Sequence, residues 1–171
     1  MGVLNICKYP DPVLRQKAKP IDNVDGKIRK LIDDMVETMY DAPGIGLAAN
    51  QVGKLLRLVV IDLQKPDYEQ GLVVLVNPEI VSAEGEIVYE EGCLSVPEFF
   101  ANVKRYDEVT VRAVDRDEKP VEIRASGLLA VVLQHEIDHL EGRLFIDKIG
   151  SVSREIFKRK WKKKQTKEAT V

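Results

Sequence analysis

The chain has 171 residues, of which 44% are hydrophobic and 32% are charged, a composition typical of a single globular domain. Its net charge of -2 argues against a general affinity for nucleic acid, so no DNA partner is expected. No apolar run is long enough to span a bilayer, and the first residues lack the features of a signal peptide. We therefore expect a cytoplasmic protein without a membrane partner.

The charge is distributed unevenly along the chain. Residues 151–171 contain eight Lys or Arg and two Asp or Glu, which gives this segment +6 and leaves -8 on residues 1–150. We expect one catalytic domain over residues 1–150, followed by a basic C-terminal helix or tail over residues 151–171. The two cysteines, Cys7 and Cys93, stand in different contexts that do not suggest a disulfide framework, and Cys7 is interpreted as a core residue.

The first quarter of the chain predicts an extended segment and two helices. Residues 3–6 are expected to form a strand or an extended arm, and residues 12–17 a short helix capped by Asp11. Asp25 caps a longer amphipathic helix that ends at residues 41–44, where a proline and a glycine break the pattern. The apolar residues of this helix recur at helical spacing: Ile28, Leu31, Ile32, Met35, Val36, Met39 and Tyr40.

Short runs rich in Val, Leu and Ile predict strands in the middle of the chain. These runs cover residues 55–63, 72–76, 87–89, 109–114 and 121–125. The strands are too short and too closely spaced for helical crossovers, so the sheets should be mainly antiparallel. The fold class expected is α+β.

The helix expected over residues 127–141 carries both histidines of the chain. His135 and His139 are four residues apart, so their imidazoles lie on one face and can meet one metal ion, while Glu136 reaches a water on that ion. Residues 127–133 are too hydrophobic for a surface helix. We therefore expect short-stranded sheets packed around a central buried helix that carries H-E-x-x-H.

Two histidines leave a catalytic site short of one protein ligand. Phe145 stands where a metzincin would have its third histidine, and Glu155, the candidate for a zincin-type site, falls in what looks like a surface helix. Cys93 is the better candidate because it lies beside a glycine and ahead of a proline, although an isolated cysteine can also be a plain buried thiol. A purely structural site would normally need a fourth ligand, and none is evident in the sequence.

Three segments of the chain, taken together, resemble the three motifs of bacterial peptide deformylase. They are G-I-G-L-A-A-N-Q at residues 44–51, E-G-C-L-S at residues 91–95 and Q-H-E-I-D-H at residues 134–139. The resemblance extends over residues 9–147 and implies a hydrolase of protein biosynthesis. Such an enzyme removes the N-formyl group from the N-terminal methionine of newly synthesised proteins and releases formate. The rival interpretations are a zincin-type metallopeptidase and a ribosome-binding or RNA-binding module with a structural metal site.

The resemblance also implies roles for individual residues. The metal ligands would be Cys93, His135 and His139. Glu136 would act as the general acid/base, and Gln51 with the backbone N–H of Leu94 would stabilise the oxyanion. The chain should bind one divalent metal ion. A Cys-His-His set accepts several metals, and we expect Fe(II) in the cell, with Zn(II), Ni(II) or Co(II) as alternatives.

Further residues are expected to bind the substrate, an N-formylmethionyl peptide. The resemblance implies that the peptide lies as an added strand against the backbone at Gly46 and Gly92. Residues seven, four and three positions before His135 should line an apolar wall beside the metal: Leu128, Val131 and Val132. Plain core packing is the alternative, and both can hold. Similarity to the family places the methionine pocket at this wall, with contributions from Ile45 and Tyr89.

Two regions do not follow directly from the resemblance. Many members of the family carry an arginine after the cysteine motif that helps to hold the peptide, whereas Phe99 and Phe100 occupy that region here. The basic segment 151–171 is most simply a solvated helix. Its charge and Trp161 also raise the hypothesis that it contacts ribosomal RNA.

Overall fold

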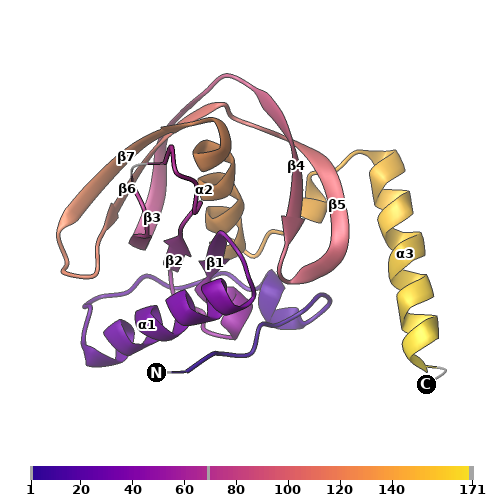
Figure 1. The fold of residues 1–171 in the computed structure, drawn as a ribbon, viewed down its shortest axis with the longest axis horizontal. Helices are drawn as coiled ribbons and strands as arrows, with labels where there is room; N and C mark the ends of the chain where they lie inside the picture. The colour runs from indigo at the N-terminus through magenta and orange to yellow at the C-terminus, as the bar shows by residue number, and fades with distance from the viewer. Residues whose placement is uncertain (1, 69, 170–171) are drawn as a thin grey trace.

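The computed structural model describes residues 2–68 and 70–169 and has the expected α+β fold. A five-stranded sheet in the order β1-β2-β3-β6-β7 and a two-stranded sheet of β4 and β5 lie around helix α2 (Figure 1). Every pairing between these strands is antiparallel, as predicted. The strands are β1 (Gly46–Ala48), β2 (Leu58–Ile61), β3 (Val73–Glu84), β4 (Ile87–Cys93), β5 (Val96–Arg105), β6 (Glu108–Val114) and β7 (Pro120–Ser126). The α-helices are α1 (Gly26–Asp41), α2 (Gly127–Leu140) and α3 (Ser151–Ala169), and the 3-10 helices are η1 (Pro12–Arg15), η2 (Ala49–Val52) and η3 (Phe145–Asp147).

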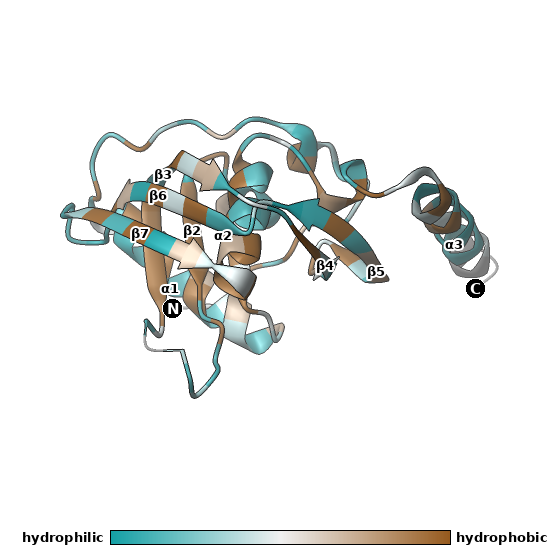
Figure 2. Ribbon diagram, turned by 90° about the horizontal axis from the view of Figure 1, so that it is seen from above, coloured by the Kyte–Doolittle hydropathy of each residue, from teal (hydrophilic) through white to brown (hydrophobic). Residues whose placement is uncertain are grey.

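Helix α2 is central because its sequence is apolar on nearly every side. Its N-terminal residues pack into a core shared with β2, β6 and β7, and Figure 2 shows hydrophobic residues of α2 beside the five-stranded sheet. The helix ends at Leu140, and Gly142, just beyond the Glu141 cap, has a left-handed φ of 75°. A Cβ at Gly142 would lie 2.5 Å from the carbonyl oxygen of Arg15, so glycine also allows the chain to pass close to η1.

Helix α1 forms as predicted, because the Asp25 side chain accepts a hydrogen bond from the Ile28 N–H at 2.9 Å. Residues 3–6 form the extended arm and not a strand, and the arm is held where the Leu4 N–H donates to Thr38 at 2.7 Å. The predicted helix over 12–17 is the shorter 3-10 helix η1, since Gln16 is already extended.

The expectation of short strands is wrong for β3 and β5. Strand β3 continues through Asn77 and Pro78 because a register shift beside Asn77, whose φ is 54°, keeps the pairing with β6. Strand β5 was not predicted. Its buried side chains alternate with exposed ones from Phe99 to Arg105, but Pro97, the charged residues and the buried arginine hide this pattern in the sequence. Strand β4 reaches Cys93, and a tight turn at Leu94 and Ser95 joins it to β5.

Helix α3 packs along the outer side of β5 (Figure 1). The rings of Phe157 and Trp161 meet the ring of Tyr9 edge to face, with centroids 5.3 and 5.1 Å apart. The predicted basic segment 151–171 is helical over Ser151–Ala169, and its residues 170–171 lie outside the described residues. Within the described residues, none of the helices has the length and apolarity that a membrane crossing requires.

Candidate metal centre

Helix α2 and the β4–β5 turn bring the three predicted metal ligands together. His135 and His139 lie one turn apart on α2, and Cys93 is the last residue of β4. The ligand atoms of these three residues all lie within 4.8 Å of one another, and the Cys93 Sγ is 3.4 Å from the His139 Nε2. In the described part of the chain this is the one group of three or more such residues that can hold a metal ion.

The donor atoms fit a metal ion. A sulfur and a nitrogen bound tetrahedrally to one zinc ion lie about 3.6 Å apart, close to the separation between Cys93 and His139. The His135 Nδ1 is engaged by the Glu91 Oε1 at 2.8 Å, which leaves the Nε2 of His135 for a metal. The set of one thiolate and two imidazoles suits Zn(II) and Fe(II), so the residues present fit the ion implied by the motif.

A buried ionic network holds His135 in place. Arg105 donates two hydrogen bonds of 2.8 Å to Glu91 and contacts Asp138 at 2.5 Å. Burial disfavours charge on Glu91, but the hydrogen bonds from Arg105 and His135 outweigh it and lower its pKa from 4.5 to about 2. Glu91 is therefore an ionised, fully engaged carboxylate that orients a metal ligand.

Sequence reasoning assigned no role to Glu91 and missed Arg105. Glu91 stands inside the E-G-C-L-S motif, so the motif itself was the available signal. The signal for Arg105 was weaker. It is the alternation of buried and exposed residues along β5, which places Arg105 on the same buried face as Phe99 and Val103. It cannot be recognised before the strand is known.

The two imidazoles have opposite proton affinities in the metal-free chain. Burial opposes charge on His135, but hydrogen bonds with Cys93 and Glu91 outweigh it and raise the pKa well above its usual value. Burial lowers the pKa of His139 well below its usual value, and the positive charges of His135 and Arg105 lower it further. The neutral His139 is thus ready to act as a metal ligand.

Glu136 follows His135 in α2 and lies against Gly46 of β1. Its side chain is buried, and its Oε1 has no hydrogen-bond partner among the described residues. Burial is the largest cause of its pKa, which rises from 4.5 to about 7. A Cβ at Gly46 would lie 2.5 Å from the Glu136 Oε2, so glycine gives the carboxylate its place. A carboxylate with this pKa can both accept and donate a proton near neutral pH.

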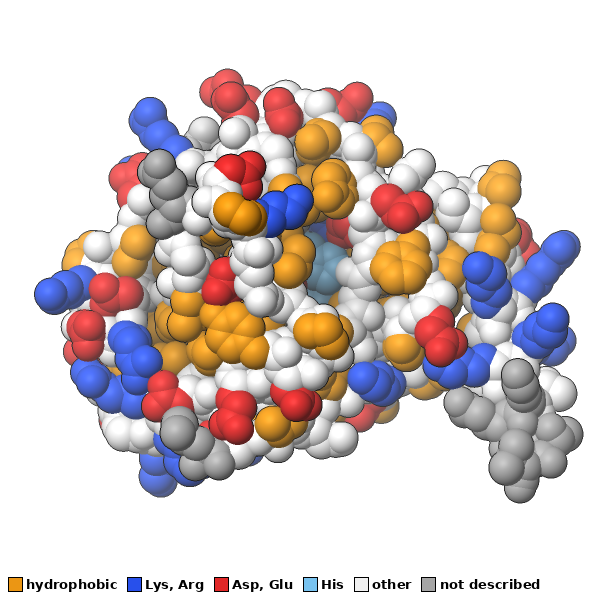
Figure 3. All heavy atoms as spheres, viewed as in Figure 1, with side chains coloured by type: hydrophobic (Ala, Val, Ile, Leu, Met, Phe, Trp, Pro, Cys, Tyr) orange, Lys and Arg blue, Asp and Glu red, His pale blue; other side chains and the backbone are white. Residues whose placement is uncertain are grey.

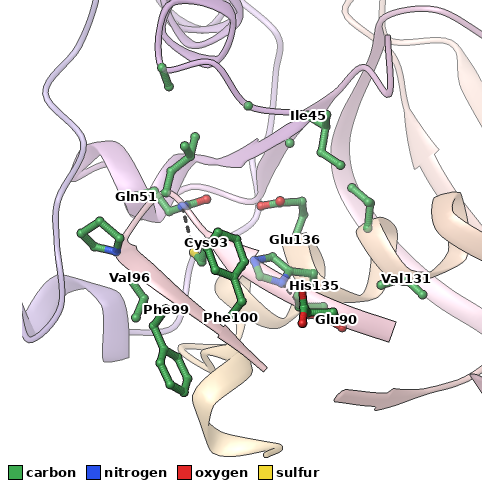
Figure 4. Close-up of a pocket in the computed structure, with 18 of the residues that line it drawn as sticks. Ile45, Gln51, Glu90, Cys93, Val96, Phe99, Phe100, Val131, His135 and Glu136 are labelled. Carbon is green, nitrogen blue, oxygen red and sulfur yellow. Dashed lines mark hydrogen bonds and ion pairs between the residues drawn. The ribbon is translucent and has the colours of Figure 1, made fainter. Parts of the chain in front are cut away.

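Gln51 is fixed with its amide N–H toward Cys93. Its Oε1 accepts the Ala48 N–H at 3.0 Å, and its Nε2 donates to the Ser95 Oγ at 3.1 Å and lies 3.6 Å from the Cys93 Sγ (Figure 4). Gln51 lies in η2, which directly follows β1, and this regular backbone together with its hydrogen bonds makes Gln51 rigid. Leu94 lies in the β4–β5 turn, where its carbonyl accepts a hydrogen bond from Lys8 at 3.1 Å.

A cavity of about 540 Å³ opens onto this site. Figure 3 shows a histidine side chain at the bottom of a hollow with hydrophobic side chains around it. All predicted site residues except His139, which is 1% exposed, line the cavity. The predicted substrate contacts among them are Ile45, Gly46, Tyr89, Gly92, Leu128, Val131 and Val132.

The chain resembles known proteins over nearly its whole length. The model of the polypeptide deformylase family matches residues 3–155. A peptide deformylase of Syntrophobacter fumaroxidans is 66% identical over 170 residues, which are 99% of each chain. One from Thermodesulfovibrio yellowstonii is 55% identical over 165 residues, which cover 96% of this chain and 100% of that protein.

Solved structures resemble the chain as well. A peptide deformylase from Legionella pneumophila superposes with a TM-score of 0.89 and 48% identity, covering 98% of both chains. The enzyme from Synechococcus elongatus in complex with actinonin superposes with a TM-score of 0.88 and 41% identity, covering 95% of this chain and 88% of that one.

Proposed function

We propose a catalytic role for each site residue from the premise that this chain belongs to the peptide deformylase family. The chain is accordingly a metalloenzyme, a hydrolase that removes the N-formyl group from nascent peptides. The observation that carries the proposal is the meeting of Cys93, His135 and His139 beside a buried carboxylate, Glu136, with a pKa of about 7.

Cys93, His135 and His139 would hold one divalent metal ion, with Fe(II) the metal in the cell and Zn(II), Ni(II) or Co(II) able to replace it. A metal ion bound there supplies Lewis-acid polarisation and lowers the pKa of water. Glu91 keeps His135 in the required tautomer and orientation through its contact with Nδ1.

Glu136 moves the protons of the reaction. It takes a proton from the water that attacks the formyl carbon and passes it to the amine nitrogen as the C–N bond breaks and formate leaves. The Gln51 amide and the backbone N–H of Leu94 donate hydrogen bonds to the oxyanion that develops on the formyl oxygen. Burial of Gln51, which is 1% exposed, strengthens this interaction because water is excluded.

The peptide would lie in the cavity as an added strand, along Gly46 of β1 and Gly92 of β4. Strand β1 is at one edge of its sheet, and in the described chain β4 pairs with β5 alone, so both strands can accept a further partner. The methionine side chain would occupy the apolar part of the cavity, formed by Ile45, Tyr89, Leu128, Val131 and Val132.

The test is formate release from formyl-Met-Ala-Ser by protein purified without oxygen, with acetyl-Met-Ala-Ser as the matched control. Activity should be lost on metal removal and restored by Fe(II), Zn(II), Ni(II) or Co(II), with the largest recovery for Fe(II). Protein that holds one metal ion per chain and releases no formate would contradict the proposal. Cleavage after methionine instead would favour the zincin-type alternative.

We further propose that residues 1–150 are the catalytic domain of a cytoplasmic protein and that 151–171 contact ribosomal RNA. The supporting observation is α3, which is held to the body by Phe157 while several of its lysines are exposed. Chain truncated after residue 150 should lose co-sedimentation with ribosomes at low salt. Unchanged co-sedimentation would reject the contact with ribosomal RNA. It would not count against the proposed deformylase activity.

A further inference from the structure

Strand β5 has a bulge at the mouth of the cavity. Strands β4 and β5 pair Glu91 with Ala101 and Cys93 with Val96, so β4 advances by two residues where β5 advances by five. Within this stretch, Glu98 adopts a left-handed φ of 65°. Bulges beside active sites commonly re-aim a side chain. The question is which side chain this bulge directs to the cavity.

The bulge gives Phe99 and Phe100 different surroundings. Phe99 is 5% exposed and packs in the core, with its ring centroid 6.1 Å from Phe145 and 4.9 Å from Phe157. Phe100 is 64% exposed and lines the cavity. Core packing therefore explains Phe99 but leaves Phe100 without a structural reason.

The Phe100 ring lies directly over Gly92. A Cβ at Gly92 would be 2.5 Å from the Phe100 Cε1, so the ring occupies the space that a side chain at this position would take. Figure 4 shows Phe100 beside Cys93 and near His135, at the metal end of the cavity. The ring thus lies on the strand along which we place the substrate.

The lining of the cavity carries charged side chains of both signs. Lys8, Glu90 and Glu98 all line the cavity, and Lys8 already donates a hydrogen bond to the Leu94 carbonyl. The exposed face of Phe100 therefore offers an apolar, planar contact. A large apolar or aromatic side chain is the group that such a surface binds best.

We propose that Phe100 is a specificity-determining residue whose ring packs against the side chain of the residue that follows formylmethionine. The proposal rests on the proposed function, which places the formyl group at Cys93 and the methionine side chain against α2. Side chains of an extended peptide alternate, so the next one points away from the methionine pocket and toward the exposed ring. Peptides with a large apolar or aromatic second residue are then preferred.

The experiment compares kcat/KM for formyl-Met-Phe-Ser and formyl-Met-Ala-Ser, using the metal-loaded full chain. The wild type should prefer the Phe peptide, and Phe100→Ala should reduce this preference by roughly threefold to tenfold, mainly through KM. Phe100→Tyr keeps the ring and should keep the preference. Tyr106→Ala is the matched control, because Tyr106 is a 53% exposed aromatic residue outside the lining of the cavity.

The outcomes separate the two proposals. If neither peptide releases formate while the metal is bound, the proposed function fails. If both release formate and Phe100→Ala leaves the ratio of their kcat/KM values unchanged, the role of Phe100 is rejected and the function stands. An equal loss of preference in Tyr106→Ala would also reject it, since the effect would not then be specific to the cavity.

Discussion

Two carboxylates that line the same cavity, Glu91 and Glu136, are each 5% exposed, but their surroundings differ. Glu91 receives two hydrogen bonds from Arg105 and contacts His135, and its pKa falls to about 2. Glu136 has an Oε1 without a partner among the described residues, and its pKa rises to about 7. Burial alone therefore does not determine the pKa of a carboxylate; its hydrogen-bond partners decide.

The two carboxylates are therefore suited to different work in the same site. Glu91 can orient a metal ligand but cannot readily carry a proton, because both of its oxygens already accept hydrogen bonds. The Oε1 of Glu136 lacks such a partner in the described chain, so the Glu136 anion is costly to bury. Glu136 can therefore exchange a proton near neutral pH. Substitutions at the two carboxylates and at residues around them test this division of work.

Glu136→Gln should have the largest effect on turnover. The amide keeps the size of the side chain but cannot carry a proton, so kcat should fall by roughly 10²- to 10⁴-fold. Steady-state kinetics with formyl-Met-Ala-Ser measures this, with far-UV circular dichroism as the check on folding. A variant that retains more than about a tenth of the wild-type kcat contradicts the role of Glu136 as general acid/base.

Arg105→Met should have the largest effect on stability. It removes the cation that neutralises Glu91 and leaves a buried charge, which typically costs roughly 3–5 kcal/mol. Urea unfolding of the metal-loaded protein measures the loss. Arg112→Met, at an exposed position of the neighbouring strand β6, is the matched control and should change stability by less than about 0.5 kcal/mol. Equal effects of the two substitutions would reject a special role for the network.

The two carboxylates should give opposite pH dependences in the metal-free protein. The pKa of Glu91 is lowered from 4.5 to about 2, so the stability it contributes is present above pH 4.5 and is lost as the pH falls through 2. The pKa of Glu136 is raised from 4.5 to about 7, so its contribution is present below pH 4.5 and is lost as the pH rises through 7. Each of these pKa shifts corresponds to a change of about 3 kcal/mol in the free energy of unfolding.

Unfolding free energies of Glu91→Gln and Glu136→Gln, each subtracted from the wild type at several pH values, measure these windows. As the pH rises from 4.5 to 7, the unfolding free energy of Glu136→Gln should increase relative to that of the wild type. As the pH rises from 2 to 4.5, the unfolding free energy of Glu91→Gln should decrease relative to that of the wild type. If the two differences in unfolding free energy changed in the same direction with rising pH, the carboxylates would not differ in the way described.

Val132→Phe should have the smallest of these effects. The larger side chain would fill part of the proposed methionine pocket and raise KM for formyl-Met-Ala-Ser by about tenfold, the equivalent of roughly 1.4 kcal/mol, without loss of metal. Val88→Phe, at an exposed position of β4 outside the cavity lining, is the control. Unchanged KM in Val132→Phe would remove this residue from the pocket.

The sequence allowed good prediction wherever a local pattern determines the structure. The spacing of His135 and His139, the Asp25 cap and the apolar start of α2 all act over one or two turns, and the structure agrees with them. The fold class and the family were also predicted correctly. The meeting of Cys93 with the two histidines is a long-range contact, and it was predicted because a metal needs a third ligand.

Other features were missed because they depend on partners far away in the chain. Arg105 in the interior is stable only because Glu91 and Asp138 lie beside it, and nothing near it in the sequence announces them. The same arginine helped to hide β5. Gly46, at which only a peptide contact was expected, also gives Glu136 its space. These interactions are properties of the tertiary structure.

Glu91 and Glu136 do different work, and a paired measurement on two variants distinguishes their roles. Bound metal and formate release from formyl-Met-Ala-Ser are determined on the same preparations of Glu91→Gln and Glu136→Gln. Glu136→Gln should keep its metal and lose turnover, whereas Glu91→Gln should bind metal roughly 10- to 100-fold more weakly and keep turnover per bound metal. The reverse pattern, or the same defect in both variants, would contradict the account.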